Sequence, residues 1–313
     1  MSSKNTAKEN LLEQFTMVLE RDRKKSDFPD WMTSWSYQEW LTVKRGSADM
    51  DTGNFSGSGD INQWFDFTAS GISTVGYIAA DLLAPLVQRS LDFDKSFLGA
   101  HDLSHDYKCL LKVATYNAED YLFQNFYAVP KRHKIKRILD FGGGYGRQIN
   151  LWSGHEGLET FIMIDAIPQS YCMQSIYCRY SELQFNEYID SDTVEAIGSS
   201  PKPAIHHLPT WRLDLLPDNF VDAVTCVQVL TELSPNLCLY AIGQFARVLK
   251  PGGMLYIRDH GVQFSPNNIA LDAVLPTFGF VLEFRPVVSD KIDIHGIPKI
   301  WRKIYPEAIL SMG

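Results

Sequence analysis

The feature that most constrains the fold is a short apolar run that leads directly into a glycine-rich turn. Residues 137–141 have the length and apolar content of a buried strand. The turn that follows, residues 142–146, contains four glycines, and a helical segment over 146–153 comes next. Glycine permits positive φ angles and, because it lacks a Cβ atom, lets a ligand approach the backbone closely. This order predicts a sheet that binds a ligand beyond the carboxyl ends of its strands.

The rest of the chain continues the alternation of strand-like and helix-like segments. Apolar runs bounded by turns are typical of strands buried on both faces of a parallel sheet. The predicted strands lie at 161–165, 223–227, 254–257, 280–284 and 299–304, and the predicted helices between them at 168–183 and 236–249. Strands that alternate with helices in this way predict the α/β class.

The first third of the chain has a different pattern. Helical periodicity is clear over 8–24, 72–92 and 103–127, and no convincing strand precedes residue 136. We therefore divide the chain into a mainly helical N-terminal unit, residues 1–130, and an α/β domain, residues 131–313. Aromatic residues are frequent from Trp31 to Phe67. They could form a lid that excludes water from a site, or the hydrophobic core of the helical unit.

Charge and cysteine content exclude several classes of function. The formal net charge of −8 argues against nucleic acid as the main partner, because such proteins carry basic surfaces for the phosphates. The five cysteines form no CxxC pair, which predicts free, mostly buried thiols in a reducing compartment. The N-terminus lacks the apolar core of a signal peptide, and no apolar run is long enough to span a membrane. We expect a cytoplasmic protein with no membrane partner.

The spacing of the glycines distinguishes between two classes of cofactor. A dinucleotide site requires the pattern GxGxxG, but the third glycine position is Arg147 counted from Gly142 and Ile149 counted from Gly144. The pattern that fits is Asp-x-Gly-x-Gly-x-Gly, beginning at Asp140. With Lys250-Pro251-Gly252-Gly253 further along, this region resembles the class I S-adenosylmethionine (SAM)-dependent methyltransferases. That resemblance implies a seven-stranded, mostly parallel sheet with an antiparallel C-terminal strand, and SAM as cofactor.

The same resemblance implies roles for particular residues. The turn would hold the amino-acid part of SAM, Asp165 would accept hydrogen bonds from both ribose hydroxyls, and Asp214 would accept one from the adenine amino group. Two vicinal hydroxyls suit the two oxygens of a carboxylate. The implied cofactor-binding residues are Asp140, Gly142, Gly143, Gly144, Asp165, Ala166, Asp214, Leu215 and Gln228.

Candidate catalytic residues follow the predicted strands at 223–227 and 254–257. Methyl transfer depends mostly on alignment of the acceptor with the methyl group, but a hydroxyl acceptor can need a base. His260 is the best candidate base, because an ordinary histidine titrates near about pH 6.5; the alternative is that His260 only caps the strand end. Asp259 could orient His260 or pair with Arg258. Glu232 is a further candidate, although its place just before the next helix, ahead of Ser234-Pro235, explains it more simply.

A second group of polar residues, His101, Asp102, His105 and Asp106, lies just before the predicted helix at 103–127. A metal site would need further acids or histidines that converge from elsewhere in the chain. Helix capping and a solvated face explain the group more simply. We therefore expect no metal site.

The sequence narrows the class of molecule that accepts the methyl group but does not identify that molecule. The Asn/Asp-Pro-Pro-aromatic motif of the nucleic-acid amino-methyltransferases and the Pro-Cys nucleophile of the cytosine carbon-5 class are absent. The long N-terminal unit resembles segments of small-molecule methyltransferases that form lids or homodimer contacts, and the layout is weakly similar to sugar O-methyltransferases of natural-product pathways. We expect O-methylation of a sugar or natural product, with S-adenosylhomocysteine as product; N- and C-methylation stay open. The alternative is a SAM-fold protein without methyl transfer, such as a binding partner or a cyclase.

Overall fold

The computed structural model describes residues 3–26, 28–32, 62, 64–66, 68–69, 78–127, 134–190, 197–200, 202–259, 267–286 and 296–304. The predicted helices of the N-terminal unit are α1 (Ser3–Ser26), α4 (Ala80–Ala100) and α5 (Tyr107–Leu122), the last continued by a π-helical turn, η3 (Phe123–Tyr127). A short 3-10 helix, η1 (Asp30–Met32), follows α1. The helix expected over 72–92 begins later, at Ala80, and extends to Ala100.

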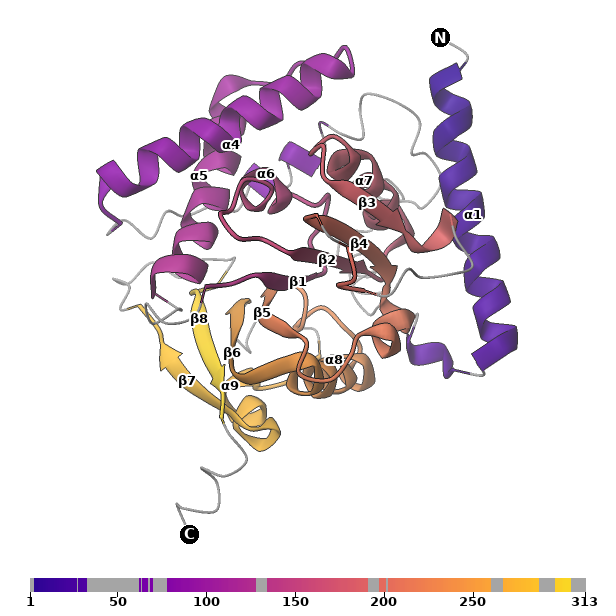
Figure 1. Ribbon diagram of the computed structural model, residues 1–313, viewed down its shortest axis with the longest axis vertical. Helices are drawn as coiled ribbons and strands as arrows, with labels where there is room; N and C mark the ends of the chain where they lie inside the picture. Colours follow the sequence, from indigo (N-terminus) through magenta and orange to yellow (C-terminus); the bar gives the residue numbers. More distant parts are fainter. Residues whose placement is uncertain are drawn as a thin grey trace.

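The α/β domain forms one twisted sheet flanked by helices (Figure 1). Its strands are β1 (Arg137–Phe141), β2 (Thr160–Asp165), β3 (Gln184–Glu187), β4 (Ala204–Pro209), β5 (Val221–Val227), β6 (Leu249–Arg258), β7 (Phe280–Phe284) and β8 (Lys299–Lys303). The connecting helices are α6 (Ile149–Trp152), α7 (Pro168–Arg179), η4 (Tyr188–Asp190), η5 (Thr210–Leu215), α8 (Pro235–Val248), α9 (Leu271–Val274) and η7 (Leu275–Phe278).

Strand order confirms the predicted fold and adds one strand to it. The order is β3-β4-β2-β1-β5-β6-β8-β7, and only the pairings of β8, with β6 and with β7, are antiparallel. The predicted seven-stranded sheet is extended at its edge by β3, which pairs in parallel with β4. Periodicity did not reveal β3 because it is only four residues long and carries polar side chains. An edge strand needs little apolar surface, since one of its sides has no neighbour.

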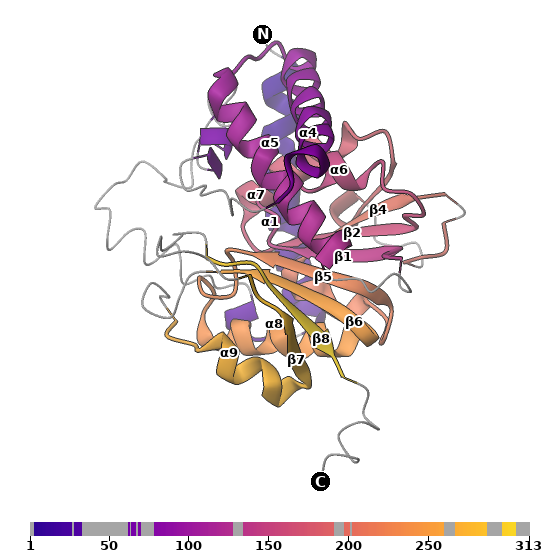
Figure 2. The same cartoon turned by 90° about the vertical axis from the view of Figure 1, so that its left-hand side faces the viewer.

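Two hydrophobic cores cover the two faces of the sheet. Alternate residues of each strand point to opposite faces, so that Leu139 and Ile138 of β1 belong to different cores. One core contains residues of α8 and α1, and the other contains residues of α4 and α5. Figure 2 shows α4 and α5 on one side of the sheet, and α8 and α9 on the other. The N-terminal helices are thus packed directly against the α/β domain.

Two segments of the domain differ locally from the sequence prediction. The helix predicted over 236–249 ends at Val248, and the strand predicted over 254–257 begins earlier, at Leu249, so Lys250-Pro251-Gly252-Gly253 lies inside the first half of β6. The pairing of β5 with β6 is irregular there, between Val221 and Ala223. His206 and His207, which lie outside every strand predicted from the sequence, are within β4 and are buried.

The cysteine prediction is confirmed: all five thiols are free, and four of them are buried. Within the described ranges, every helix is too short or too polar to cross a lipid bilayer.

Candidate functional site

The carboxyl ends of the central strands meet at one edge of the sheet, where the chain reverses direction of winding. β1 lies in the middle of the sheet, between β2 and β5. The connection that leaves β1 leads to β2 on one side, and the connection that leaves β4 leads back across the sheet to β5 on the other side, so the two connections run in opposite directions. Open α/β sheets bind ligands at such a topological switch point. The predicted residues Asp140, Gly142 and Asp165 all lie at this edge, because they end or follow β1 and β2. The structure therefore brings the central part of the predicted cofactor site together.

The glycine turn is fixed by contacts that leave no room for side chains. The Gly142 amide donates to the carbonyl of Ile164 at 2.7 Å, which ties the turn to β2. Gly142 has φ +72°, and a Cβ atom there would lie 2.3 Å from a methyl group of Val229. A Cβ atom on Gly143 would lie 2.4 Å from the carboxylate of Asp140. The glycines are thus required by close packing of the turn against its neighbours.

Asp140 lies beneath this turn and is 2% exposed. Burial raises the pKa of its carboxyl group to about 7, while the nearby Arg147 lowers it and Asp120 raises it further. Among the described residues, its Oδ2 atom has no hydrogen-bond partner. A buried acceptor without a partner costs free energy, which is what a ligand-binding group lacking its ligand would show.

Asp165 ends β2 and is also almost completely buried. Burial raises the pKa of its carboxyl group to about 7, although hydrogen bonds from the Ile167 and Ala166 amides and from Gln174 oppose the rise. Oδ1 accepts from the Ile167 amide at 2.9 Å, and Oδ2 accepts from Gln174 Nε2 at 2.9 Å. A carboxylate has about four acceptor positions. Asp165 is therefore held in one orientation, and the three hydrogen bonds leave about one acceptor position for a ligand.

A chain of buried hydrogen bonds holds Gln174 in place. Its Nε2 also donates to the carbonyl of Gly144 at 2.9 Å, so Gln174 links the glycine turn to Asp165. Its Oε1 must then accept from His207 Nε2, 3.0 Å away. His207 Nδ1 lies 2.8 Å from Glu187, which also accepts from Tyr171. A continuous buried network therefore runs from Glu187 through His207 and Gln174 to Asp165.

Asp214 and Leu215 do not lie with these residues. They are in η5, and the carbonyls of the flanking Leu213 and Leu216 accept hydrogen bonds from Arg247, in the last turn of α8. That turn leads into the amino end of β6, which is the opposite edge of the sheet. The Asp214 side chain is exposed and pairs with Arg212 at 3.0 Å.

The residue that follows β4 at the carboxyl edge is instead Thr210. Thr210 is 1% exposed, and its hydroxyl has no hydrogen-bond partner among the described residues. This unsatisfied hydroxyl makes Thr210 a further candidate for contact with a ligand at this edge. Asp214, four residues later, lies in the 3-10 helix that leads away from the end of β4.

Gln228 follows β5 in a strained conformation. It has φ +58°, which is uncommon for a residue other than glycine, and its buried Nε2 has no partner within the described residues. Strain of this kind concentrates at functional sites. Glu232 lies in the turn before α8, whose first residues are capped by Ser234.

Asp259 follows β6 and joins two of the loops at the carboxyl edge. Its Oδ1 accepts from the Thr231 hydroxyl at 2.6 Å, and its Oδ2 lies 3.3 Å from the Thr231 amide. It thus connects the end of β6 to the loop after β5. His260, the predicted base, is outside the described residues but is the next residue along the chain. A cavity of about 160 Å³ adjoins Asp259 and is lined by residues that include Leu271, Lys299 and Trp301.

A buried ionic cluster attaches α5 to the same edge. Asp120 of α5 accepts from Arg147 at 2.6 Å and from Tyr256 at 2.6 Å, and it lies 3.2 Å from Arg258. The guanidinium groups of Arg147 and Arg258 lie 4.3 and 4.4 Å from the ring centre of Tyr116. Arg258 is thus paired with residues of α5.

The aromatic segment contributes directly to the site. Phe65 is buried, and its ring centre lies 5.0 Å from that of Tyr145 in the glycine turn. A Cβ atom on Gly144 would lie 3.7 Å from the Trp64 ring, so Trp64 covers the turn. Trp31 contacts Tyr240 of α8 with ring centres 5.5 Å apart. The other aromatics between Trp31 and Phe67 lie outside the described residues.

Sequence reasoning missed Gln174, Thr210 and the contact made by Trp64. A signal for Gln174 exists, because it lies four residues after Ser170, and both are buried on α7. Polar residues on the buried face of a helix usually have a specific partner. The partners of Trp64 could not be predicted, since the contact joins segments about 80 residues apart.

The residues at this edge fit SAM as ligand. The glycine turn gives close backbone approach, Asp165 offers a carboxylate acceptor, and Asp140, Thr210 and Gln228 present buried polar atoms that have no partners among the described residues.

Comparison with known proteins gives one family match and several structural likenesses. Residues 139–257 match the family model described as a methyltransferase domain. A search of curated proteins finds no significant match. Among solved structures, the [4+2]-cyclase SpnF is 17% identical over 72% of this chain and 94% of its own, with a TM-score of 0.44. The N-methyltransferase NodS from Bradyrhizobium japonicum WM9 is 13% identical over 61% of this chain and 95% of its own, with a TM-score of 0.43.

A SAM-dependent methyltransferase from Aquifex aeolicus is 19% identical over 54% of this chain and 82% of its own, with a TM-score of 0.36. The matched region, 139–257, spans β1 to β6 and so includes the glycine turn, Asp165 and Gln228.

Proposed function

We propose that the protein is a SAM-dependent methyltransferase that methylates a hydroxyl group of a small molecule, such as a sugar or another natural product; the match of residues 139–257 to a methyltransferase-domain model supports the methyl transfer. The observation that carries this proposal is the convergence of Asp140, the glycine turn and Asp165 at the switch point of the sheet. Bound SAM supplies an electrophilic methyl group on a sulfonium. The acceptor class rests on the acidic charge balance and on the N-terminal unit packed beside the site.

The residues of the chain then have distinct tasks. Asp165, oriented by Gln174, accepts hydrogen bonds from the ribose hydroxyls, and the backbone of Gly142 to Gly144 follows the amino-acid part. Gln228 donates its free amide hydrogens to cofactor or acceptor. Trp64 excludes water above the turn. We assign residues 1–130 to covering the site and selecting the acceptor.

Proton removal is assigned to His260. It directly follows Asp259 in the sequence, and Asp259 itself lies just after β6, on the edge that carries the other site residues. Asp259 is held by Thr231, and Glu232 lies in the loop after β5. A neutral histidine can accept the hydroxyl proton at physiological pH.

Calorimetry with SAM tests the cofactor site. Wild-type protein should bind SAM, and Asp165→Ala should bind it roughly 10- to 100-fold more weakly, as expected for the loss of a charge-assisted hydrogen bond of about 1.5–3 kcal/mol. Asp218→Ala, at an exposed carboxylate, is the matched control and should bind normally. If the wild type has no measurable affinity for SAM, the proposal is wrong.

The acceptor is tested separately. Protein incubated with methyl-labelled SAM and extracts of small metabolites should give a labelled product whose methyl group is bound to oxygen. His260→Gln should lower the turnover rate while leaving SAM affinity within about twofold. A labelled methyl group on nitrogen or carbon would contradict the hydroxyl acceptor and indicate N- or C-methylation instead. SAM binding without any methyl transfer would favour the alternative of a SAM-fold protein that does not methylate.

A further inference from the structure

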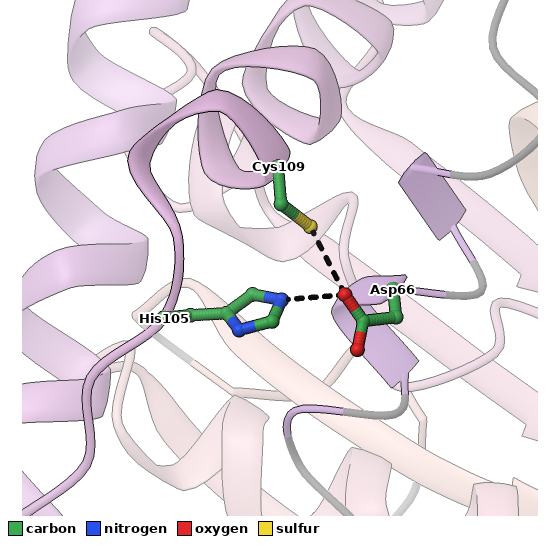
Figure 3. A group of neighbouring side chains, drawn as sticks. All are labelled: Asp66, His105 and Cys109. Carbon is green, nitrogen blue, oxygen red and sulfur yellow. Dashed lines mark hydrogen bonds and ion pairs between the residues drawn. The ribbon is translucent and has the colours of Figure 1, made fainter.

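Three side chains able to bind a metal ion meet on the N-terminal side of the site. Figure 3 shows Asp66, from the aromatic segment, facing His105 and Cys109 at the start of α5. Asp66 Oδ1 lies 2.9 Å from His105 Nε2 and 3.7 Å from Cys109 Sγ. All three potential ligand atoms lie within 4.8 Å of one another. Asp66 is the further acid from elsewhere in the chain that the sequence analysis required for a metal site, and Cys109 adds a thiol from the start of α5.

The separations match the edges of a tetrahedral zinc site. Zinc binds imidazole nitrogen and carboxylate oxygen at about 2.0–2.2 Å and thiolate sulfur at about 2.3 Å. Tetrahedral angles then place neighbouring ligand atoms about 3.3–3.6 Å apart. The observed 2.9 and 3.7 Å lie on either side of that range. Shifts of about half an ångström, within the rotamer freedom of Asp66, would bring both of its separations into that range, and the His105 and Cys109 ligand atoms lie within 4.8 Å of each other.

Two of the three ligands are held by local structure. Asp106 is the N-cap of α5 and accepts from the Cys109 amide at 3.0 Å, which fixes the first turn that carries Cys109. The His105 side chain is only 12% exposed, and its ring lies beside Phe65. Asp66 is 65% exposed and adjusts to them. This pattern, in which two fixed ligands are joined by one adjustable carboxylate, suits capture of an ion from solvent.

A reactive cysteine explains the group less well. The thiol of Cys109 donates to the carboxylate of Asp66 rather than to His105. The carboxylates of Asp66 and Asp106 both lie near this thiol, so its surroundings are negative. A nucleophilic cysteine needs the opposite environment.

We propose that Asp66, His105 and Cys109 bind one zinc ion, with the remaining coordination position open to water. Cysteine, histidine and carboxylate together favour a borderline-soft divalent ion over calcium or magnesium. The ion would join the segment Trp64–Asp66 to α5. Because the Trp64 ring packs next to Gly144, the ion would also hold Trp64 in place over the glycine turn.

Binding is tested with Co²⁺ and Zn²⁺ on the full chain, independently of SAM. After treatment with a chelator and desalting, one equivalent of Co²⁺ should give the visible absorption of a tetrahedral site and a near-ultraviolet thiolate-to-cobalt band. Zn²⁺ should abolish both by displacement. One equivalent of Zn²⁺ should also raise the midpoint of thermal unfolding, because an ion that binds only the folded state stabilises it.

Variants distinguish this site from adventitious binding. Cys109→Ser should lose the thiolate band, and His105→Gln or Asp66→Asn should weaken Co²⁺ binding at least tenfold. The matched controls Cys172→Ser and Asp81→Asn should bind as the wild type does. Circular dichroism checks that each variant is folded, and Asp66→Asn, at an exposed side chain, keeps the test available if the others unfold. Wild-type uptake below one equivalent, or an unchanged thiolate band in Cys109→Ser, would overturn the proposal.

Discussion

Three aspartates are buried without full pairing, and burial raises the pKa of each to about 7. They are Asp94 on α4, Asp140 beneath the glycine turn and Asp165 at the end of β2. A buried carboxylate loses hydration, so the neutral form is favoured. Two of the three lie in the candidate cofactor site, where shifted pKa values are common.

Cofactor affinity should depend on pH through Asp165. The carboxylate accepts hydrogen bonds more strongly than the neutral acid, and with a pKa near 7 it is mostly protonated at pH 6 and mostly ionised at pH 8. We therefore expect S-adenosylhomocysteine to bind roughly tenfold more tightly at pH 8 than at pH 6. Calorimetry at both values measures this ratio. Asp165→Asn should remove most of the change; a ratio that persists in the variant would assign it to another group, such as Asp140.

Asp94 should make the stability fall as pH rises. Its side chain accepts from Tyr177 and Asn150, and its Oδ2 is buried without a partner in the described residues. Between about pH 4 and 7 the folded state holds a proton that the unfolded state has released, so the free energy of unfolding decreases with pH and levels off above 7.

The variant Asp94→Asn should remove that contribution, because the amide does not ionise. Its loss of stability between pH 5 and pH 8 should be smaller than that of the wild type by about 2 kcal/mol. Urea unfolding at both pH values measures the difference. The exposed Asp218→Asn is the control and should follow the wild type; equal slopes for Asp94→Asn and wild type would contradict the prediction.

At the scale of elements, the free-energy cost of replacing a glycine in a turn has two parts, one from the backbone conformation and one from side-chain packing. Gly142 and Gly157 both have positive φ, at +72° and +84°. A Cβ atom on Gly142 meets Val229 at 2.3 Å, whereas on Gly157 it meets nothing within 4 Å. The two positions therefore differ in packing and share the backbone conformation.

Alanine at the two positions should have unequal effects. Gly157→Ala should cost about 1–2 kcal/mol, from the left-handed backbone alone. Gly142→Ala should cost roughly 1–3 kcal/mol more, from the collision, and should also weaken SAM binding. Urea unfolding and calorimetry measure the two effects. If both variants lose equal stability, then Val229 moves aside and the packing argument fails.

For the molecule as a whole, the cluster around Asp120 joins the N-terminal helices to the sheet. It unites α5, the glycine turn and the end of β6, through Arg147, Arg258 and Tyr256. All of these side chains are buried, so their charges depend on one another. Removing one charge from a buried pair leaves the other uncompensated.

Asp120→Asn should therefore destabilise the protein by about 3–5 kcal/mol. The matched control is Asp190→Asn, which breaks the half-exposed pair with Arg179 and should cost less than about 1 kcal/mol. Thermal and urea unfolding compare them. A small effect in Asp120→Asn would mean that the cluster relaxes and that apolar contacts alone hold α5.

The sequence by itself determined the order of elements and the centre of the site. β1 occupies the predicted residues 137–141, and β2, β5 and β6 contain the predicted runs, because buried parallel strands must be continuously apolar. Asp140, the glycines and Asp165 were found for a related reason: a glycine turn and a strand-ending acid are local patterns, and the carboxyl ends of parallel strands share one edge.

Only the tertiary structure decided which distant residues join that centre. Asp214 had the right residue type but lies at the other edge, while Thr210 holds the place after β4. The contacts of Gln174 with Asp165, of Trp64 with Gly144, and of Asp66 with His105 and Cys109 join segments that the chain separates. Such contacts depend on how helices pack on the sheet, and residue spacing does not encode them. The local sequence pattern determined where the cofactor-binding turn lies in the chain, and the packing of the N-terminal unit against the sheet determined which residues surround that turn.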